Sequence, residues 1–148
     1  MGSTFGRAAA QAGHDVVGLG RAAGASTHWP AAYKQTEATA EALGSRIGEV
    51  GPDLIFHGAG TASVAGSFAD PQTDFHGSVQ LFRSVLEAMR RSGSKAVLIF
   101  PSSAAVYGNP SALPVSEDAP IQPISPYGFH KAICELMARE YAASFALP

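Results

Sequence analysis

Residues 96–103 read Ala-Val-Leu-Ile-Phe-Pro-Ser-Ser, an unbroken apolar run that is closed by a proline and two serines. A short continuous apolar run of this kind is typical of a strand in a parallel sheet that is covered on both faces. We therefore expect a buried strand over 96–100 with the serines at its carboxyl end. A proline-rich loop over 101–126 follows, and then a helix over 127–145.

Helical and strand-like patterns alternate along the rest of the chain. We expect strands over 16–19 and 53–57, and helices over 7–12, 36–50 and 75–91. Glycines at 13, 51 and 93 stand where helices commonly end. This alternation predicts an α/β fold, with a doubly wound parallel sheet whose ligands bind beyond the carboxyl ends of the strands.

Apolar side chains at three- and four-residue spacing indicate which faces of the longer helices are buried. On the helix over 75–91 they are Val79, Phe82, Val85, Leu86 and Met89. On the last helix they are Phe129, Ile133, Leu136 or Met137, and Tyr141.

The composition excludes several classes of protein. A length of 148 residues fits one domain, and 46% hydrophobic residues argue against disorder. A net charge of −2 predicts neither a nucleic-acid nor an anionic-membrane partner, and no apolar run reaches the ~20 residues that span a bilayer. The single cysteine, Cys134, forbids an internal disulfide, so we expect a cytoplasmic protein with Cys134 in its core.

Tyr127 and Lys131 are four residues apart at the start of a predicted helix and therefore share one face. A lysine ammonium close to a phenol favours the phenolate, which makes tyrosine a usable base. Ser103 ends the buried strand and is placed to contact the same substrate oxygen. A Tyr-x-x-x-Lys pair alone is usually a solvated face beside a core aromatic. Here it follows a buried strand that ends in serines, which favours proton transfer coupled to hydride transfer.

This layout resembles the extended short-chain dehydrogenase/reductase family, in its NAD-dependent epimerase/dehydratase branch, with a UDP-glucose 4-epimerase-like motif order. The matching residues are Ser102-Ser-Ala-Ala-Val-Tyr-Gly108, Pro114, Glu117, Pro120, Pro123 and Ser125-Pro-Tyr-Gly-x-x-Lys131. The resemblance implies a Rossmann-like fold that binds NAD or NADP, a nucleotide-sugar or other small-molecule substrate, and epimerase or reductase activity. It assigns Ser103 as the catalytic serine, Tyr127 as the general acid/base and Lys131 as the residue that holds the nicotinamide ribose.

The same resemblance implies further cofactor-binding residues. Gly2, Ser3 and Gly6 match part of the glycine-rich loop that cradles a pyrophosphate at a helix start. His57, Ala59 and Gly60 match the turn that passes the adenosine side of the cofactor. For His57, an ordinary hydrogen-bonded histidine at a strand end is an equally good interpretation.

Two departures bear on the cofactor and the reaction. Gly20 stands where the family often has an acid that binds the adenosine ribose, and Arg21 follows it, which gives a weak preference for NADP over NAD. Ala104 and Ala105 stand where related dehydratases carry a carboxylate, so dehydration is disfavoured.

The chain begins without the apolar first strand of the family and stops before its substrate-binding region. We therefore interpret residues 1–148 as a partial NAD(P)-binding Rossmann-like domain with unpaired strand edges. Two alternatives stay open, an inactive fragment of such an enzyme and a non-catalytic cofactor-binding protein. The family also implies a homodimer that forms through the helices over 75–91 and 127–145.

Overall fold

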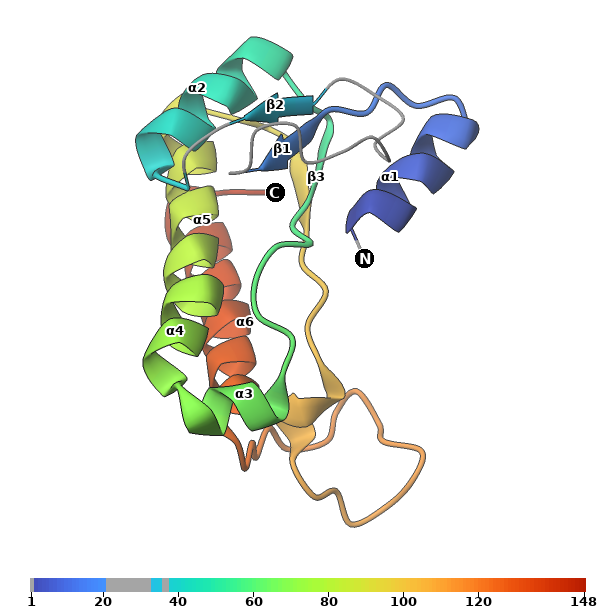
Figure 1. Cartoon of the computed structure of the whole chain (residues 1–148), viewed down its shortest axis with the longest axis vertical. Coiled ribbons are helices and arrows are strands. Elements are labelled where there is room, and N and C mark those ends of the chain that lie inside the picture. Colours follow the sequence, from blue (N-terminus) through green and yellow to red (C-terminus); the bar gives the residue numbers. More distant parts are fainter. Residues whose placement is uncertain (1, 21–32, 36–37) are drawn as a thin grey trace. The chain divides into compact units, whose positions relative to one another are not determined.

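The computed structural model describes residues 2–20, 33–35 and 38–148 (Figure 1). The chain forms two compact units. The first contains residues 1–58, 84–99 and 147–148, and the second contains residues 59–83 and 100–146.

The first unit carries the strands. Its elements are α1 (Gly2–Gln11), β1 (Gly18–Gly20), β2 (Tyr33–Gln35), α2 (Ala40–Val50), β3 (Leu54–Phe56), most of α5 (Leu81–Ser92) and β4 (Val97–Ile99). β1 pairs with β2 and β3 pairs with β4, both in parallel, as two separate two-stranded sheets. In the second pair Ile55 lies opposite Leu98. The α/β class and the parallel pairing are confirmed, and β2 is a strand that the sequence pattern did not predict.

The core of the first unit forms on one face of the β3–β4 pair. Ile55 and Leu98 pack there against a buried cluster from α2, α5 and the residue before β4. The members of that cluster are Leu43, Ile47, Val85, Ala88, Met89 and Ala96.

The opposite face of this pair is exposed, so the prediction that the strand over 96–100 is covered on both faces was wrong. Leu54, Val97 and Ile99 are 44%, 52% and 38% exposed. Successive strand residues point to opposite faces, and α2 and α5 cover only the face that carries Ile55 and Leu98.

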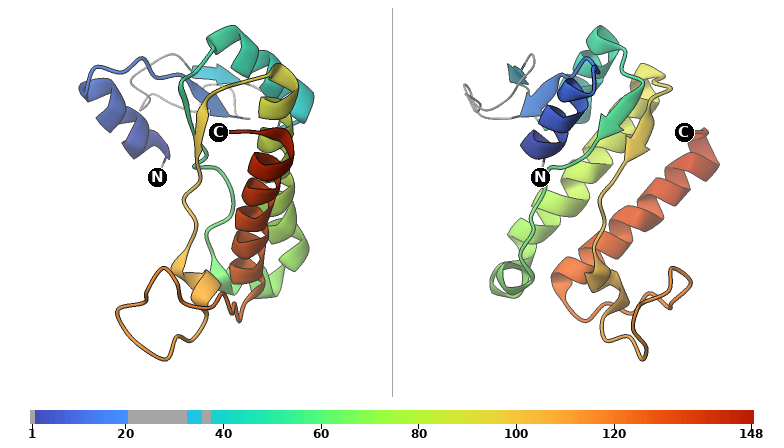
Figure 2. Two further views of the ribbon diagram at one scale, coloured as in Figure 1. Left: turned by 180° about the vertical axis from the view of Figure 1, so that it is seen from behind. Right: turned by 90° about the vertical axis from the view of Figure 1, so that its right-hand side faces the viewer.

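The second unit is mainly helical. Its elements are α3 (Val64–Ala69), α4 (Pro71–Phe75), the π-helical turn η1 (His76–Gln80), the start of α5, the 3₁₀ helix η2 (Ala104–Tyr107) and α6 (Pro126–Phe145). A long loop leaves η2 and returns to the start of α6 (Figure 2). The helix expected over 75–91 thus begins earlier, after the Asp70 cap, and contains a π turn. The short helix α3 was not predicted.

Three glycines end helices where the sequence predicts it. Gly13, Gly51 and Gly93 have φ of 89°, 58° and 66°, the left-handed region that glycine adopts without strain. The Gly51 N–H donates to the Ile47 carbonyl across 2.9 Å and closes α2.

The buried stripe of the last helix differs from the predicted one. Phe129, Ile133 and Leu136 are 53%, 37% and 66% exposed. The buried residues of α6 are Gly128, Lys131, Cys134 and Tyr141. The buried face therefore includes a glycine and a lysine, which an apolar pattern does not reveal, and only Cys134 and Tyr141 are confirmed as core. The five apolar residues predicted for the helix over 75–91 are all buried.

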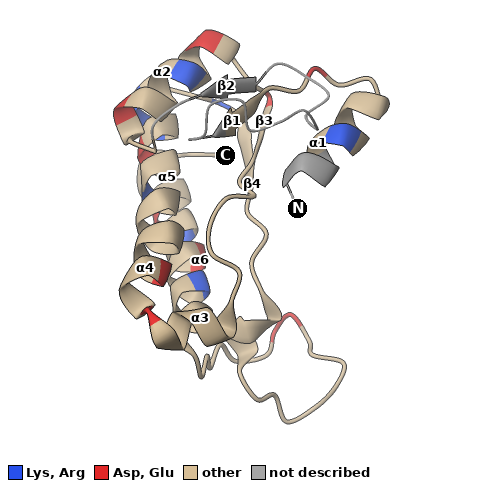
Figure 3. Ribbon diagram, viewed as in Figure 1, with Lys and Arg blue, Asp and Glu red and all other residues tan. Residues whose placement is uncertain are grey.

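Both acidic and basic residues lie on α2 and α5 (Figure 3). On α5, Arg90 and Arg91 both donate to Glu87 across 2.7 Å and hold the pKa of its carboxyl at about 2. Among the described residues, no helix is both long and apolar enough to cross a membrane.

Candidate functional site

The first turn of α6 is shaped by its own cap and by α3. Ser125 is the N-cap and accepts the Gly128 N–H across 3.1 Å, and Pro126 takes the first helical position, where a proline costs no hydrogen bond. The Tyr127 N–H donates to the hydroxyl of Ser67, a residue of α3 that is 1% exposed. The backbone of Tyr127 is therefore fixed from two elements.

Gly128 lets η2 approach this turn. A Cβ on Gly128 would lie 2.5 Å from the Ala105 carbonyl oxygen and 3.0 Å from Cβ of Pro123. Ser103 caps η2, because its hydroxyl oxygen accepts the Ala105 N–H across 3.2 Å. The predicted catalytic serine thus begins a short helix that packs directly on the turn that carries Tyr127.

Lys131 lies one turn further along α6 and is only 8% exposed. Its Nζ donates to the Pro101 carbonyl across 3.3 Å. The ammonium lies 4.7 Å from the ring centre of Phe100 and 5.8 Å from that of Tyr127. Aromatic faces attract cations at these distances. The structure therefore brings Lys131, Tyr127 and the residues that follow β4 together.

The turn at Ala59 and Gly60, which is expected to lie beside the cofactor, has small residues and is exposed to solvent. Gly60 has φ of 132°, and a Cβ there would lie 3.2 Å from the Gly77 carbonyl oxygen, so a glycine is required on both counts. His57 is 7% exposed, and its backbone N–H continues the β3–β4 ladder by donating to the Ile99 carbonyl across 2.9 Å.

The N-terminal candidates do not form the expected loop. Gly2, Ser3 and Gly6 lie within α1, which begins at Gly2. The alanine-rich segment that follows favours helix and extends it back to these residues. These three candidates belong to the first unit, whereas Ser103, Tyr127 and Lys131 belong to the second. Arg21 lies outside the described residues.

Sequence reasoning missed three polar residues near this site, the buried Ser67 and Asp74 and the partly buried His130. Asp74 is 3% exposed, and its carboxylate contacts the Nδ1 atom of His130 at 2.5 Å. A signal was present in the sequence, because Asp74 and Ser78 continue the apolar stripe of Phe82 and Val85 at helical spacing. Polar residues on such a stripe indicate buried hydrogen bonds.

Cys134 adds no nucleophile to the site. It is fully buried, and desolvation raises the pKa of its thiol to about 11. Within residues 2–20, 33–35 and 38–148, no group of three or more His, Cys, Asp or Glu side chains gathers as metal ligands would.

Comparisons with known proteins agree on one family. The family model "NAD dependent epimerase/dehydratase family" matches residues 1–148. The chain is 36% identical over 101 residues to a UDP-glucose 4-epimerase of Corynebacterium glutamicum. This alignment covers 68% of this chain and 30% of that protein. It is 38% identical over 95 residues to a UDP-glucose 4-epimerase of Azospirillum brasilense, which covers 64% of this chain and 27% of that protein.

Solved structures extend the match over nearly the whole chain. A UDP-glucose 4-epimerase of Brucella ovis in complex with NAD superimposes with a TM-score of 0.91 and 29% identity, covering 99% of this chain and 46% of that one. The Thermus thermophilus enzyme in complex with NAD gives a TM-score of 0.88, again with 29% identity, covering 99% of this chain and 49% of that one.

The chain therefore spans about 30% of the curated relatives and somewhat less than half of the solved ones. The preference for NADP drawn from Gly20 and Arg21 has no support in these comparisons, because both solved relatives carry NAD. The Rossmann-type α/β fold of the solved relatives agrees with the family model, which matches residues 1–148. The chain belongs to the NAD-dependent epimerase/dehydratase family.

Proposed function

We propose that residues 1–148 form the NAD-binding and proton-transferring part of a UDP-sugar 4-epimerase. The observation that carries the proposal is the enclosed Lys131 ammonium between the rings of Phe100 and Tyr127, beside the helix that Ser103 caps. The named relatives, which are UDP-glucose 4-epimerases, support the substrate class.

The residues fit a nicotinamide cofactor in chemical terms. An ammonium has three N–H donors, and the Pro101 carbonyl accepts one of those of Lys131. The others suit the hydroxyls of a ribose. The exposed Ala59 and Gly60 turn, with no bulky side chain, suits close passage of the adenosine side. When bound, NAD supplies the acceptor and donor of hydride.

The chain's own residues move the proton. Tyr127 is the base that takes the proton of the sugar C4 hydroxyl as hydride leaves C4, which gives a 4-keto sugar. Return of hydride to the other face of C4 and return of the proton from Tyr127 complete the inversion. The Ser103 oxygen accepts the Ala105 N–H, and this bond leaves its O–H proton available to donate to the sugar oxygen.

Titration calorimetry of the 148-residue chain with NAD and with NADP tests the cofactor assignment. We expect NAD to bind and NADP to bind more weakly. UDP-galactose is then supplied with NAD, and formation of UDP-glucose is followed by chromatography. Tyr127→Phe should lower turnover at least about 100-fold while NAD still binds.

Near-normal turnover in Tyr127→Phe would overturn the role of Tyr127. NAD binding without turnover in the wild-type chain would favour a non-catalytic cofactor-binding protein. Failure to bind NAD would favour an inactive fragment.

We also propose that α6 contributes to a homodimer, together with the helix over 75–91, in a cytoplasmic protein. Phe129, Ile133 and Leu136 are exposed at four- and three-residue spacing on α6. Analytical ultracentrifugation should show a dimer, and Leu136→Lys should shift it toward monomer.

A further inference from the structure

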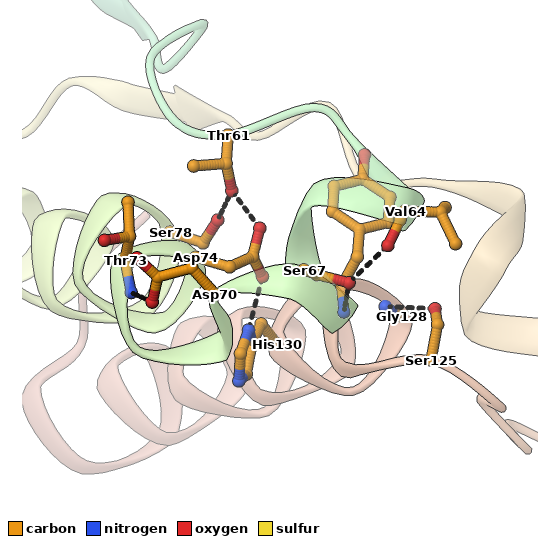
Figure 4. Close-up of polar contacts among 11 residues, drawn as sticks. Thr61, Val64, Ser67, Asp70, Thr73, Asp74, Ser78, Ser125, Gly128 and His130 are labelled. Atoms are coloured by element: carbon orange, nitrogen blue, oxygen red, sulfur yellow. Dashed lines mark hydrogen bonds and ion pairs between the residues drawn. The ribbon is translucent and has the colours of Figure 1, made fainter.

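A chain of hydrogen bonds converges on the buried carboxylate of Asp74 (Figure 4). The Thr61 hydroxyl donates to Oδ1 of Asp74, and Nδ1 of His130 contacts Oδ2 at 2.5 Å. Thr61 also contacts the Ser78 hydroxyl at 2.8 Å. Because the single proton of Thr61 goes to Asp74, Ser78 is the donor in that contact.

The same reasoning assigns the proton on His130. An ionised carboxylate only accepts hydrogen bonds, so Nδ1 of His130 carries the proton that faces Oδ2. Ser78 therefore donates to Thr61, while Thr61 and His130 both donate to Asp74. We call Ser78, Thr61, Asp74 and His130 the Asp74 network.

The Asp74 network ties three segments of the second unit. Thr61 follows the Gly60 turn, Asp74 and Ser78 lie on α4 and η1, and His130 lies on α6. The backbone is close-packed at this point, because a Cβ on Gly77 would lie 2.9 Å from the Thr61 methyl group. The Phe75 ring also meets the His130 ring edge-on, with centroids 5.4 Å apart.

His130 and Lys131 are adjacent on α6, so their side chains leave the helix about 100° apart. His130 is fixed to Asp74, and Lys131 is fixed to the Pro101 carbonyl. Two anchors on different sides of one helix restrict its rotation about its own axis. The Tyr127 side chain projects from the turn that these anchors hold.

We propose that Asp74 and His130 are positioning residues that set the rotation of the first turns of α6, and thereby the placement of Tyr127 and Lys131 against the Gly60 turn. The role for NAD binding rests on the proposed function above. Cys134 on α6 is a titratable group close enough to Asp74 for the two to interact electrostatically.

Three variants separate the role of this network from simple packing. Asp74→Leu removes both acceptors. His130→Gln removes the ring. Asp74→Asn keeps the shape, and its amide can accept from Thr61 while donating to Nδ1 of His130, provided that the ring proton moves to Nε2. His76→Gln is the matched control, because His76 also contacts the Phe75 ring but is exposed.

Long-range ¹H–¹⁵N spectra of the labelled chain report the His130 ring directly. We expect a protonated Nδ1 in the wild type and in His76→Gln, and an unprotonated Nδ1 in Asp74→Asn. Amide exchange of α6 residues 127–131 should accelerate at least about tenfold in Asp74→Leu and His130→Gln, and stay near the wild-type rate in Asp74→Asn. Exchange in β4 serves as the internal reference for global unfolding.

NAD affinity, measured by calorimetry, links the network to function. It should fall about tenfold in Asp74→Leu and His130→Gln, and be largely retained in Asp74→Asn and His76→Gln. An unprotonated Nδ1 in the wild type, or unchanged exchange and affinity in both disruptive variants, overturns the inference. If the wild-type chain does not bind NAD, the proposed function fails, and the ring protonation and exchange data still decide whether the network holds α6.

Discussion

The Tyr127 backbone N–H donates to the Ser67 hydroxyl across 3.0 Å, so a side chain of α3 caps the first N–H of α6, which begins at Pro126. Ser67 in turn donates to the Val64 carbonyl across 2.7 Å. A helix start has amides without partners inside the helix. One of them is satisfied here by a residue 60 positions away in the chain.

Replacing Ser67 should loosen the start of α6. Ser67→Ala leaves the Tyr127 N–H without its buried acceptor, which costs about 1–3 kcal/mol of unfolding free energy. Urea unfolding followed by circular dichroism measures the cost, and amide exchange at Tyr127 should accelerate. Ser45→Ala, on the exposed surface of α2, is the control and should change stability little. Equal stability of the two variants would contradict the cap.

A methyl group at position 128 should disrupt the contact between α6 and η2. Gly128→Ala places a Cβ 2.5 Å from the Ala105 carbonyl oxygen, and such overpacking costs about 1–3 kcal/mol. Gly48→Ala is the matched control, because Gly48 is also helical and a Cβ there meets nothing within 4 Å. That change should stabilise α2 by about 0.5–1 kcal/mol. Thermal unfolding of both variants should therefore show shifts of opposite sign.

Lys131 should contribute to function rather than to stability. Its ammonium is buried with a carbonyl and two aromatic rings, and burying a charge costs free energy. Lys131→Met should leave the free energy of unfolding within about 1 kcal/mol of wild type, or raise it. NAD binding and any turnover should fall sharply. Lys95→Met, at an exposed position before β4, should change neither property. If Lys131→Met unfolds while Lys95→Met stays folded, Lys131 has a structural role instead.

Cys134 should resist thiol reagents while the chain is folded. Burial raises the pKa of its thiol from 9.0 to about 11, so the reactive thiolate is scarcer than in the unfolded chain. Modification near neutral pH should therefore require denaturant.

The raised pKa of the Cys134 thiol also makes the stability of the folded chain depend on pH. Because the folded state favours the neutral thiol, this contribution to stability is complete below pH 9 and is lost as the pH rises toward about 11. Wild type should therefore lose more stability than Cys134→Ala between pH 9 and pH 11, measured by urea unfolding at each pH. Parallel losses would show that Cys134 does not titrate differently on folding.

The sequence predicted best those features that depend on residues close together in the chain, such as strands and helix ends. The strand before Ser103 and the helix ends at Gly51 and Gly93 follow from apolar runs and from glycine's access to positive φ. Tyr127 and Lys131 were predicted from their spacing together with the strand and serines that precede them and the family resemblance. In the structure the Lys131 ammonium lies near the rings of both Tyr127 and Phe100.

The features that the sequence did not predict depend on contacts between residues that are distant in the chain. Lys131 is buried on α6 while Phe129 and Leu136 are exposed, because Phe100 and Pro101 surround the lysine. The partnership of Asp74 and His130 joins residues 56 positions apart. Helical periodicity in one segment carries no information about such contacts.

The two compact units alternate along the chain, which passes between them after Gly58, Arg83, Ile99 and Ala146. One of these passages falls inside α5, so a single helix supplies residues to both units. No single cut in the chain releases either unit whole. Truncation at one position therefore cannot isolate the unit that carries Tyr127 and Lys131, and producing that unit alone would require joining residues 59–83 to residues 100–146.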